Sequence, residues 1–337
     1  MPALGNRVTS ITQDKYLPFL VDQVLGSNVL ASRMLRAAKK WSGNQIRFPV
    51  KISKNSTGTS FSGFDTFSTS ATNNRITLDY NPKFYQITVA LPLDELSANA
   101  TDSKVLDLAG IEIQTAAHDL ADDVGNLLYA DGSGNSSKDF NGLSNIINNS
   151  GTIGGQSRAT YSVLNSTVTA SGGTLTLALM QTLYSNVASG SNVPTVGYCT
   201  EAVANFYEQL LNPQERIVKD VSMMKGGLAG GTGFTALYFK GFPILADEKS
   251  TAQQLAFVNE DYLDWYGLPL ALTEPVKFKS QDVRGNDYSN LLGLGFSFSG
   301  WIKPSNQAAI VGHIYLGGEL VASAPRFMGR LTGITGV

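Results

Sequence analysis

Cysteine and histidine are nearly absent from the 337-residue chain, which has one cysteine, Cys199, and two histidines, His118 and His313. A single cysteine excludes an intrachain disulfide framework and any metal site built from several cysteines. The two histidines lie far apart in the sequence, and neither has a second metal-ligand residue at a suitable spacing. We therefore predict no metal site, and we interpret Cys199 as a small buried hydrophobic side chain.

Charge is also scarce, since charged residues make up 15% of the chain and the formal net charge is −2. Such a balance provides no overall attraction to nucleic acid or to an anionic membrane. No apolar run approaches the length of a membrane span, and residues 1–10 lack the apolar core of a signal peptide. We therefore expect synthesis in a cytosol and no membrane partner.

Common enzyme motifs are missing as well. The glycine-rich segment 226–233 lacks the Gly-Lys-Ser/Thr ending of a phosphate-binding loop, and no G-x-S-x-G nucleophile motif occurs. Asp122 and Asp123 are adjacent, so on a helix their carboxylates diverge by about 100° and do not converge on a substrate. We predict no catalytic residue, no cofactor and no enzyme activity, although a carboxylate pair formed by tertiary contact stays an open alternative.

Among the features that are present, residues 102–130 form the longest regular pattern. Apolar side chains recur there at steps of three and four, the period of a helix with one buried stripe. These side chains are Leu106, Ala109, Ile113, Ala117, Leu120, Val124 and Leu127. Asp102 suits the N-cap, and Gly132 can end the helix in a left-handed conformation. At about 1.5 Å per residue, this acidic helix would be roughly 40 Å long.

Residues 46–53 and 75–91 alternate between apolar and polar side chains, which predicts two strands. About twenty residues rich in Ser, Thr, Gly and Asn separate them, with aromatic rings at Phe61, Phe64 and Phe67. A lone hairpin has little core of its own, and exposed aromatics need a covering surface. We infer that another subunit covers these three rings; the alternative is a disordered loop with incidental aromatics.

Residues 1–45 are basic and carry too few apolar residues to form a core of their own. A nucleic-acid interpretation is possible, but the basic cluster is small and lacks interleaved aromatics. We favour an arm that lies on an acidic surface, such as that of the long helix. The predicted intersubunit contacts are Arg33, Arg36, Lys39 and Lys40 of the arm, and Asp119, Asp122 and Asp123 of the helix.

The second half of the chain predicts a further α/β region. Residues 177–187 and 201–211 have helical spacing, and residues 194–199 have the pattern of a buried strand. The last eighty residues consist mostly of short apolar or alternating runs separated by Gly and Pro, which indicates β-structure. The whole pattern predicts an α+β fold.

The order of these parts resembles the major capsid proteins of tailed bacteriophages, the Hong Kong 97 fold family. Local similarities are LLYADGSGNSSKDFNGL (127–143), YFKGFPILADEKSTAQQLAFVNEDYL (238–263) and LVASAPRFMGRLTGI (320–334). The resemblance covers nearly the whole chain but includes no invariant catalytic motif. It implies a Hong Kong 97-like fold with an N-terminal arm, an extended β-hairpin (the E-loop), a long spine helix in a β-rich peripheral domain, and an α/β axial domain.

The resemblance also implies a division of the chain. Its counterparts are 1–45 for the arm, 46–92 for the E-loop hairpin, 93–145 for the peripheral domain with the spine helix, 146–262 for the axial domain, and 263–337 for the return to the peripheral domain and the C-terminal strand. The prototype's Lys–Asn cross-link is not carried over. Lys51 and Lys54 lie in the hairpin, but nothing identifies a partner asparagine or a catalytic glutamate.

The function implied by the resemblance is a major capsid protein. Such a chain self-assembles through hexameric and pentameric capsomers into an icosahedral shell that encloses the double-stranded DNA of a tailed phage or prophage. Its implied partners are copies of itself, a portal, a scaffolding or decoration protein, and DNA contacted non-specifically. The implied location is the virion, after assembly in the host bacterial cytoplasm. The alternatives are an encapsulin-type nanocompartment shell and a non-capsid β-rich virion or adhesin protein.

Overall fold

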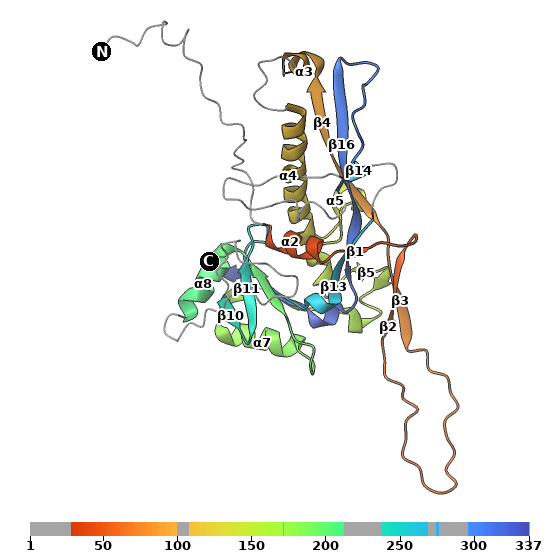
Figure 1. The fold of residues 1–337 in the computed structure, drawn as a ribbon. Helices are drawn as coiled ribbons and strands as arrows, with labels where there is room; N and C mark the ends of the chain where they lie inside the picture. The colour runs from red at the N-terminus through yellow and green to blue at the C-terminus, as the bar shows by residue number, and fades with distance from the viewer. Residues whose placement is uncertain are drawn as a thin grey trace.

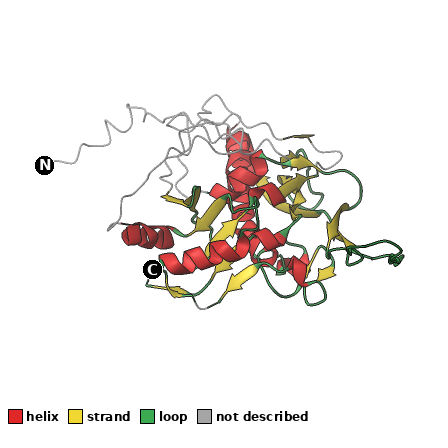
Figure 2. Ribbon diagram, turned by 90° about the horizontal axis from the view of Figure 1, so that it is seen from below, coloured by secondary structure: helices red, strands yellow, loops and turns green. Residues whose placement is uncertain are grey.

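The computed structural model describes residues 28–99, 108–170, 172–211, 237–268, 274–275 and 296–336. These residues form two large β-sheets with helices beside and between them (Figure 1, Figure 2). The α+β class predicted from the sequence is therefore confirmed. The predicted N-cap at Asp102, the glycine-rich segment 226–233 and the arm residues 1–27 lie outside the described residues.

The first sheet is organised around its longest strand, β16. Its strands, in spatial order, are β1 (Lys39–Lys40), β13 (Leu263–Gly267), β16 (Ala309–Ala322), β15 (Phe296–Phe298) and β14 (Glu274–Pro275), with β4 (Lys83–Pro92) also paired to β16. The β4–β16 ladder is antiparallel and runs from Pro92 opposite Ala309 to Lys83 opposite Gly318. The two strands form a long ribbon that ends beside helix α3 (Leu93–Asn99) (Figure 1).

The predicted spine helix is confirmed as α4 (Leu108–Tyr129), which lies along this ribbon (Figure 1). Its apolar stripe is buried: Ala117, Leu120 and Val124 belong to the main hydrophobic core. Gly132 follows the helix with a φ of +76°, the left-handed conformation expected at a C-terminal stop. The spacing of apolar residues therefore predicted both the helix and its buried face.

The second sheet joins strands from distant parts of the sequence. Its strands, in spatial order, are β10 (Leu237–Phe239), β11 (Phe242–Ala246), β9 (Val196–Cys199), β12 (Leu255–Val258), β17 (Gly329–Leu331) and β7 (Thr167–Thr169). Helices α7 (Leu177–Val187) and α8 (Glu201–Leu211) pack on one face, where Leu255 and Phe257 meet them. The other face, with Tyr198 and Val258, joins the core around the spine helix. Both helices agree with the sequence prediction.

The last strands of the chain lie outside the first sheet, and the expected domain division stays a prediction. Strand β17 pairs with β12 and β7, and β18 (Ile334–Thr335) pairs with β8 (Gly173–Thr174), so the last strands join the second region. Leu331 and Ile334 are buried in the core beneath α7 and α8. Burial of these two side chains explains why the chain crosses over before it ends.

Short elements connect these layers. They are α5 (Gly134–Ser137), α6 (Leu143–Ile146), the hairpin of β5 (Thr152–Ile153) and β6 (Gln156–Ser157), and the 3-10 turns η1 (Ser162–Leu164), η3 (Glu260–Tyr262) and η4 (Pro325–Phe327). Cys199 is buried, as predicted, and burial raises the pKa of its thiol to about 12.

Helix α2 (Val29–Arg36), at the end of the predicted arm, is packed into the body of the protein. Its N-terminus is held by Asp247, whose Oδ2 accepts hydrogen bonds from Leu30 N at 2.9 Å and from the Tyr129 hydroxyl at 2.9 Å. The carboxylate therefore satisfies a backbone donor that would otherwise lack a partner at the helix start. Burial raises the pKa of Asp247.

The same helix carries Arg33, which faces inward. Its Nε donates to Glu260 Oε1 at 2.8 Å, and the Tyr198 hydroxyl donates to the same oxygen at 2.8 Å. Arg33 and Glu260 are both largely buried. The charge of Arg33, predicted to contact a neighbouring subunit, is thus neutralised within its own chain.

This arrangement predicts unequal losses of stability on truncating two basic residues. Arg33→Ala leaves the Glu260 carboxylate buried without its partner, so the free energy of unfolding should fall by about 3 kcal/mol. Lys39→Ala removes a pair with Asp264 in which the lysine side chain is 52% exposed, and the loss there should be below about 1 kcal/mol. Urea unfolding of unassembled subunits measures both values. Small, equal losses would contradict the buried-pair interpretation.

Candidate assembly site

A long hairpin projects from the body of the protein (Figure 1). Strand β2 (Ile46–Lys51) pairs antiparallel with β3 (Arg75–Tyr80), from Ile46 opposite Tyr80 to Lys51 opposite Arg75. Residues 52–74 extend beyond these strands as a loop. The predicted hairpin is confirmed, but the predicted second strand is divided at residues 81–82, and its later part is β4 of the first sheet.

The end of the hairpin exposes three phenylalanine rings. Phe61 is 66% exposed, Phe64 106% and Phe67 61%. The rings of Phe61 and Phe67 contact each other edge to face, with their centroids 5.2 Å apart. Residues 61–67, called the aromatic tip below, therefore present apolar surface to solvent in an arrangement that is already formed within the subunit.

Polar contacts shape the loop that carries the aromatic tip. Ser62 N donates to Asp65 Oδ2 at 2.8 Å, which closes a tight turn between Phe61 and Phe67. Farther back, Thr72 Oγ1 donates to Asn55 Oδ1 at 3.2 Å and joins the two sides of the loop. Together with the backbone bond from Ile52 N to the Asn74 carbonyl at 2.9 Å, these bonds link the two sides of the loop beyond β2 and β3.

The base of the hairpin is held by the β5–β6 hairpin. Asp79 N donates to the Gly154 carbonyl at 2.9 Å, and Gln156 Nε2 donates to the Thr77 carbonyl at 2.9 Å. Gly154 has a φ of +53°, and a Cβ added there would lie 2.7 Å from the Cβ of the buried Leu78. Close backbone approach at Gly154 thus fixes the direction in which the long hairpin leaves the body.

The charged residues predicted for intersubunit contact have different surroundings. Lys249 Nζ donates to Asp122 Oδ2 at 2.8 Å, and the Tyr85 hydroxyl donates to Asp123 Oδ2 at 3.1 Å. Both carboxylates therefore join α4 to other parts of the same chain. Lys40 and Asp119 are exposed.

Two further basic residues were predicted in this group. Lys39 Nζ donates to Asp264 Oδ2 at 2.6 Å, and its strand β1 pairs with β13. Arg36 is the last residue of α2, and its side chain lies outside the described part of the structure. Contact of these groups, and of the aromatic tip, with another subunit stays a prediction.

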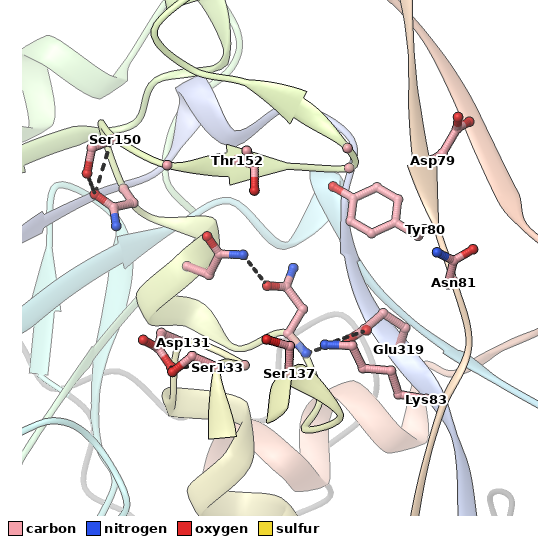
Figure 3. A pocket seen from close by; sticks show the side chains of 17 residues that line it. Asp79, Tyr80, Asn81, Lys83, Asp131, Ser133, Ser137, Ser150, Thr152 and Glu319 are labelled. Carbon is pink, nitrogen blue, oxygen red and sulfur yellow. Dashed lines mark hydrogen bonds and ion pairs between the residues drawn. The ribbon is translucent and has the colours of Figure 1, made fainter. Parts of the chain in front are cut away.

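A polar pocket of ≈ 440 Å³ lies where the base of the hairpin meets the end of α4 and the loop before β5 (Figure 3). Asp79 and Tyr80 of β3, Lys83 of β4, Asn141 and Glu319 are among its lining residues. Sequence reasoning missed this pocket because its residues are distant along the chain. The one local signal was Glu319, a carboxylate among apolar residues near the end of β16.

Glu319 is 3% exposed and is held by several donors. Its Oε1 accepts from Asn141 N at 2.5 Å and from Leu320 N at 3.1 Å, while Lys83 Nζ lies 3.5 Å from Oε2. Burial raises the pKa of Glu319 to about 7, although Lys83 and the backbone donors oppose the shift. Glu319 thus joins β16 to the start of β4 and to the segment after the spine helix.

The described residues contain no group of three or more His, Cys, Asp or Glu side chains able to hold a metal ion. In the same part of the chain, no helix has the length and apolar character required to cross a membrane. Among the large hydrophobic side chains that the described residues expose, Phe61, Phe64 and Phe67 of the hairpin are the most exposed.

The raised pKa of Glu319 predicts a pH-dependent stability. The folded state keeps the Glu319 proton up to a pKa of about 7, whereas the unfolded chain loses it near the ordinary glutamate pKa of 4.5. Between pH 4.5 and about pH 7, the folded state therefore binds more protons than the unfolded chain. The free energy of unfolding should thus fall by up to about 3 kcal/mol as the pH rises across this range. Glu319→Gln retains an oxygen acceptor but cannot titrate, and its pH dependence should be flatter.

Urea unfolding at several pH values between 4 and 8 provides the measurement. Glu248→Gln, at an exposed position, is the matched control and should follow the wild-type curve. Identical curves for wild type and Glu319→Gln would show that Glu319 makes no contribution to the pH dependence.

The chain is similar to known proteins in its fold and not in its sequence. Neither a protein-family model nor a curated protein sequence matches significantly. Among solved structures, a chain of the cyanophage A-1(L) capsid asymmetric unit has a TM-score of 0.74 at 16% identity, over 98% of this chain and 100% of that one. The SrpI encapsulin of Synechococcus elongatus PCC 7942 has a TM-score of 0.62 at 11% identity, over 97% and 94%.

A third similar structure is the capsid of an empty GTA particle, with a TM-score of 0.61 at 12% identity over 98% of this chain and 96% of that one. All three similarities extend over nearly the full length of both chains. The chain therefore has the fold of the major capsid proteins of tailed bacteriophages, as its resemblance to the Hong Kong 97 family predicted.

Proposed function

We propose that the chain is a major capsid protein that self-assembles through hexameric and pentameric capsomers into an icosahedral shell enclosing the double-stranded DNA of a tailed phage or prophage. The observation that carries the proposal is the aromatic tip, which projects from a well-packed body and is covered by no part of the described chain (Figure 1). A contact surface on a neighbouring subunit would bury these rings. The shared capsid fold supports this function.

In this proposal the chain is a structural protein that catalyses no reaction. Its partners are copies of itself, a portal, and a scaffolding or decoration protein. With a net charge of −2, it contacts packaged DNA only weakly and without sequence preference. It is made and assembled in the host bacterial cytoplasm and resides in the virion.

An encapsulin-type shell is the second candidate, because a complex of that kind shares the fold. Its TM-score of 0.62 lies between the 0.74 of the cyanophage capsid chain and the 0.61 of the GTA capsid, so fold similarity alone does not separate the two candidates. The contents of the particle distinguish the two. Particles from the native host should contain nuclease-protected double-stranded DNA, whereas an enclosed protein cargo would support the encapsulin alternative.

The proposal predicts that the purified chain forms closed shells, seen by negative-stain microscopy, and that the aromatic tip is required for them. The triple variant F61S/F64S/F67S should form no stable shells. Because the rings are exposed in the subunit, its free energy of unfolding should change by no more than about 0.5 kcal/mol. The matched control F61Y/F64Y/F67Y keeps the aromatic area and should assemble.

Two outcomes would contradict these expectations. A wild-type chain that stays monomeric at high concentration, with and without a scaffolding protein, would argue against a shell protein. A large fall in the unfolding midpoint of the serine variant would show that the rings belong to the core of the subunit.

A further inference from the structure

The polar pocket at the base of the hairpin has no role in the proposed shell function (Figure 3). Its volume of ≈ 440 Å³ is more than ten times the roughly 30 Å³ that one water molecule occupies. Pockets of about 300–1,000 Å³ are typical of small-molecule sites. The pocket is therefore large enough for a small organic ligand.

The lining of this pocket is almost wholly polar. Tyr80 is the one lining residue with an aromatic side chain, and its hydroxyl donates to Ala322 O at 2.8 Å. Apart from four glycines, the other lining residues carry carboxylate, amide, hydroxyl or ammonium groups. Because polar groups removed from water need hydrogen-bond partners, such a lining suits a ligand whose own surface is polar.

The charged groups of the lining are already held within the subunit. Lys83 Nζ lies 3.5 Å from Glu319 Oε2. Arg47 Nε lies 3.2 Å from Asp79 Oδ1, an ion pair without hydrogen-bond geometry. Asp131 Oδ1 accepts two hydrogen bonds, of 3.0 and 2.7 Å, from the turn that follows it. A charged ligand would have to compete with these contacts, whereas a neutral ligand would not.

Neutral donors of the lining, in contrast, are still available. Asn141 is 7% exposed, and its Oδ1 accepts from Asn145 Nδ2 at 2.6 Å. No described residue accepts a hydrogen bond from Asn141 Nδ2, from Asn81 Nδ2 or from the Thr152 hydroxyl. Asn81 and Thr152 lie on different sides of the pocket (Figure 3). Since an unmade hydrogen bond at a buried donor is costly, acceptor groups placed here would be stabilising.

We propose that the pocket at the base of the hairpin binds a neutral polyhydroxylated molecule, which is the chemistry of a carbohydrate. Sugar hydroxyl groups accept hydrogen bonds from amides and donate them to carboxylate and carbonyl oxygens, and they carry no charge that must be desolvated. The pocket is formed within one subunit, so this inference goes beyond the proposed shell function and does not depend on it.

Calorimetric titration of the purified full-length chain with glucose and with galactose tests the proposal. At least one of the two sugars should bind saturably, with a dissociation constant of about 10 mM or lower. Absence of saturable binding by both sugars would overturn the proposal and leave the shell function intact. Saturable binding in a chain that forms no shells would remove only the shell function.

A bulky side chain placed in the pocket tests the location of the site. Thr152 is exposed and lines the pocket, so Thr152→Trp should keep the wild-type urea midpoint and weaken sugar binding by more than about ten-fold. Thr160, exposed and outside the lining, provides the matched control Thr160→Trp, which should bind as the wild type does. Equal affinities of the two variants would overturn the proposed location.

A second variant tests one of the free donors directly. Asn81→Ala removes an amide at an exposed position and should leave the fold unchanged. Loss of a single hydrogen bond to the sugar should lower the affinity by about three-fold or more. An unchanged affinity would contradict the role given to this amide.

Charged sugars test the neutral character of the ligand. The amino sugars and uronic acids of glucose and galactose have the same rings with an ammonium or a carboxylate group. They should bind at least about ten-fold more weakly than their neutral parents. Tighter binding of an amino sugar than of its parent would overturn the proposal in favour of a cationic ligand.

A soluble polymer of the sugar that binds, dextran for glucose or galactan for galactose, separates two sources of the ligand. Binding of the polymer and the free sugar would support the proposal with a glycan chain as the source. Binding of the free sugar alone would support it with a small soluble molecule as the source.

Discussion

Buried carboxylates are the interactions on which the rest of this fold depends. Asp247 bonds to the start of α2 and to Tyr129 at the end of the spine helix, and Glu260 bonds to Arg33 and Tyr198. Glu319 bonds to the segment after the spine helix and lies beside Lys83. Burial of a carboxylate is costly, so each of these groups requires its donors to be in place. That requirement locks the helices and both sheets into one arrangement.

A body held in this way can support a hairpin that has almost no core of its own. Within the described part of the chain, strands β2 and β3 pair only with each other, and residues 52–74 are held by a few polar bonds across the loop. The contact of Gly154 with Leu78 connects this weak element to the strongly packed body. The subunit thus combines a well-packed body with a projecting hairpin whose phenylalanine rings are exposed to solvent.

The sequence was sufficient to predict features that depend on local periodicity, and insufficient for those that depend on distant partners. The spacing of Ala117, Leu120 and Val124 predicted the spine helix, and strand alternation predicted the hairpin with its exposed rings. The bond of Arg33 to Glu260 within the subunit was not predicted, because Glu260 is 227 residues away along the chain. For the same reason, neither the joining of β17 to the second sheet nor the pocket around Glu319 had a local signature.

The two hydrogen bonds between the β5–β6 hairpin and β3 are made to the backbone of β3. Gly154 accepts from the amide of residue 79, and Gln156 donates to the carbonyl of residue 77. Substitutions at these two β3 positions leave both hydrogen bonds available, and residues 52–74 take no part in them. The side chains of residues 52–74 can therefore change without removing either of the hydrogen bonds that hold the base of the hairpin.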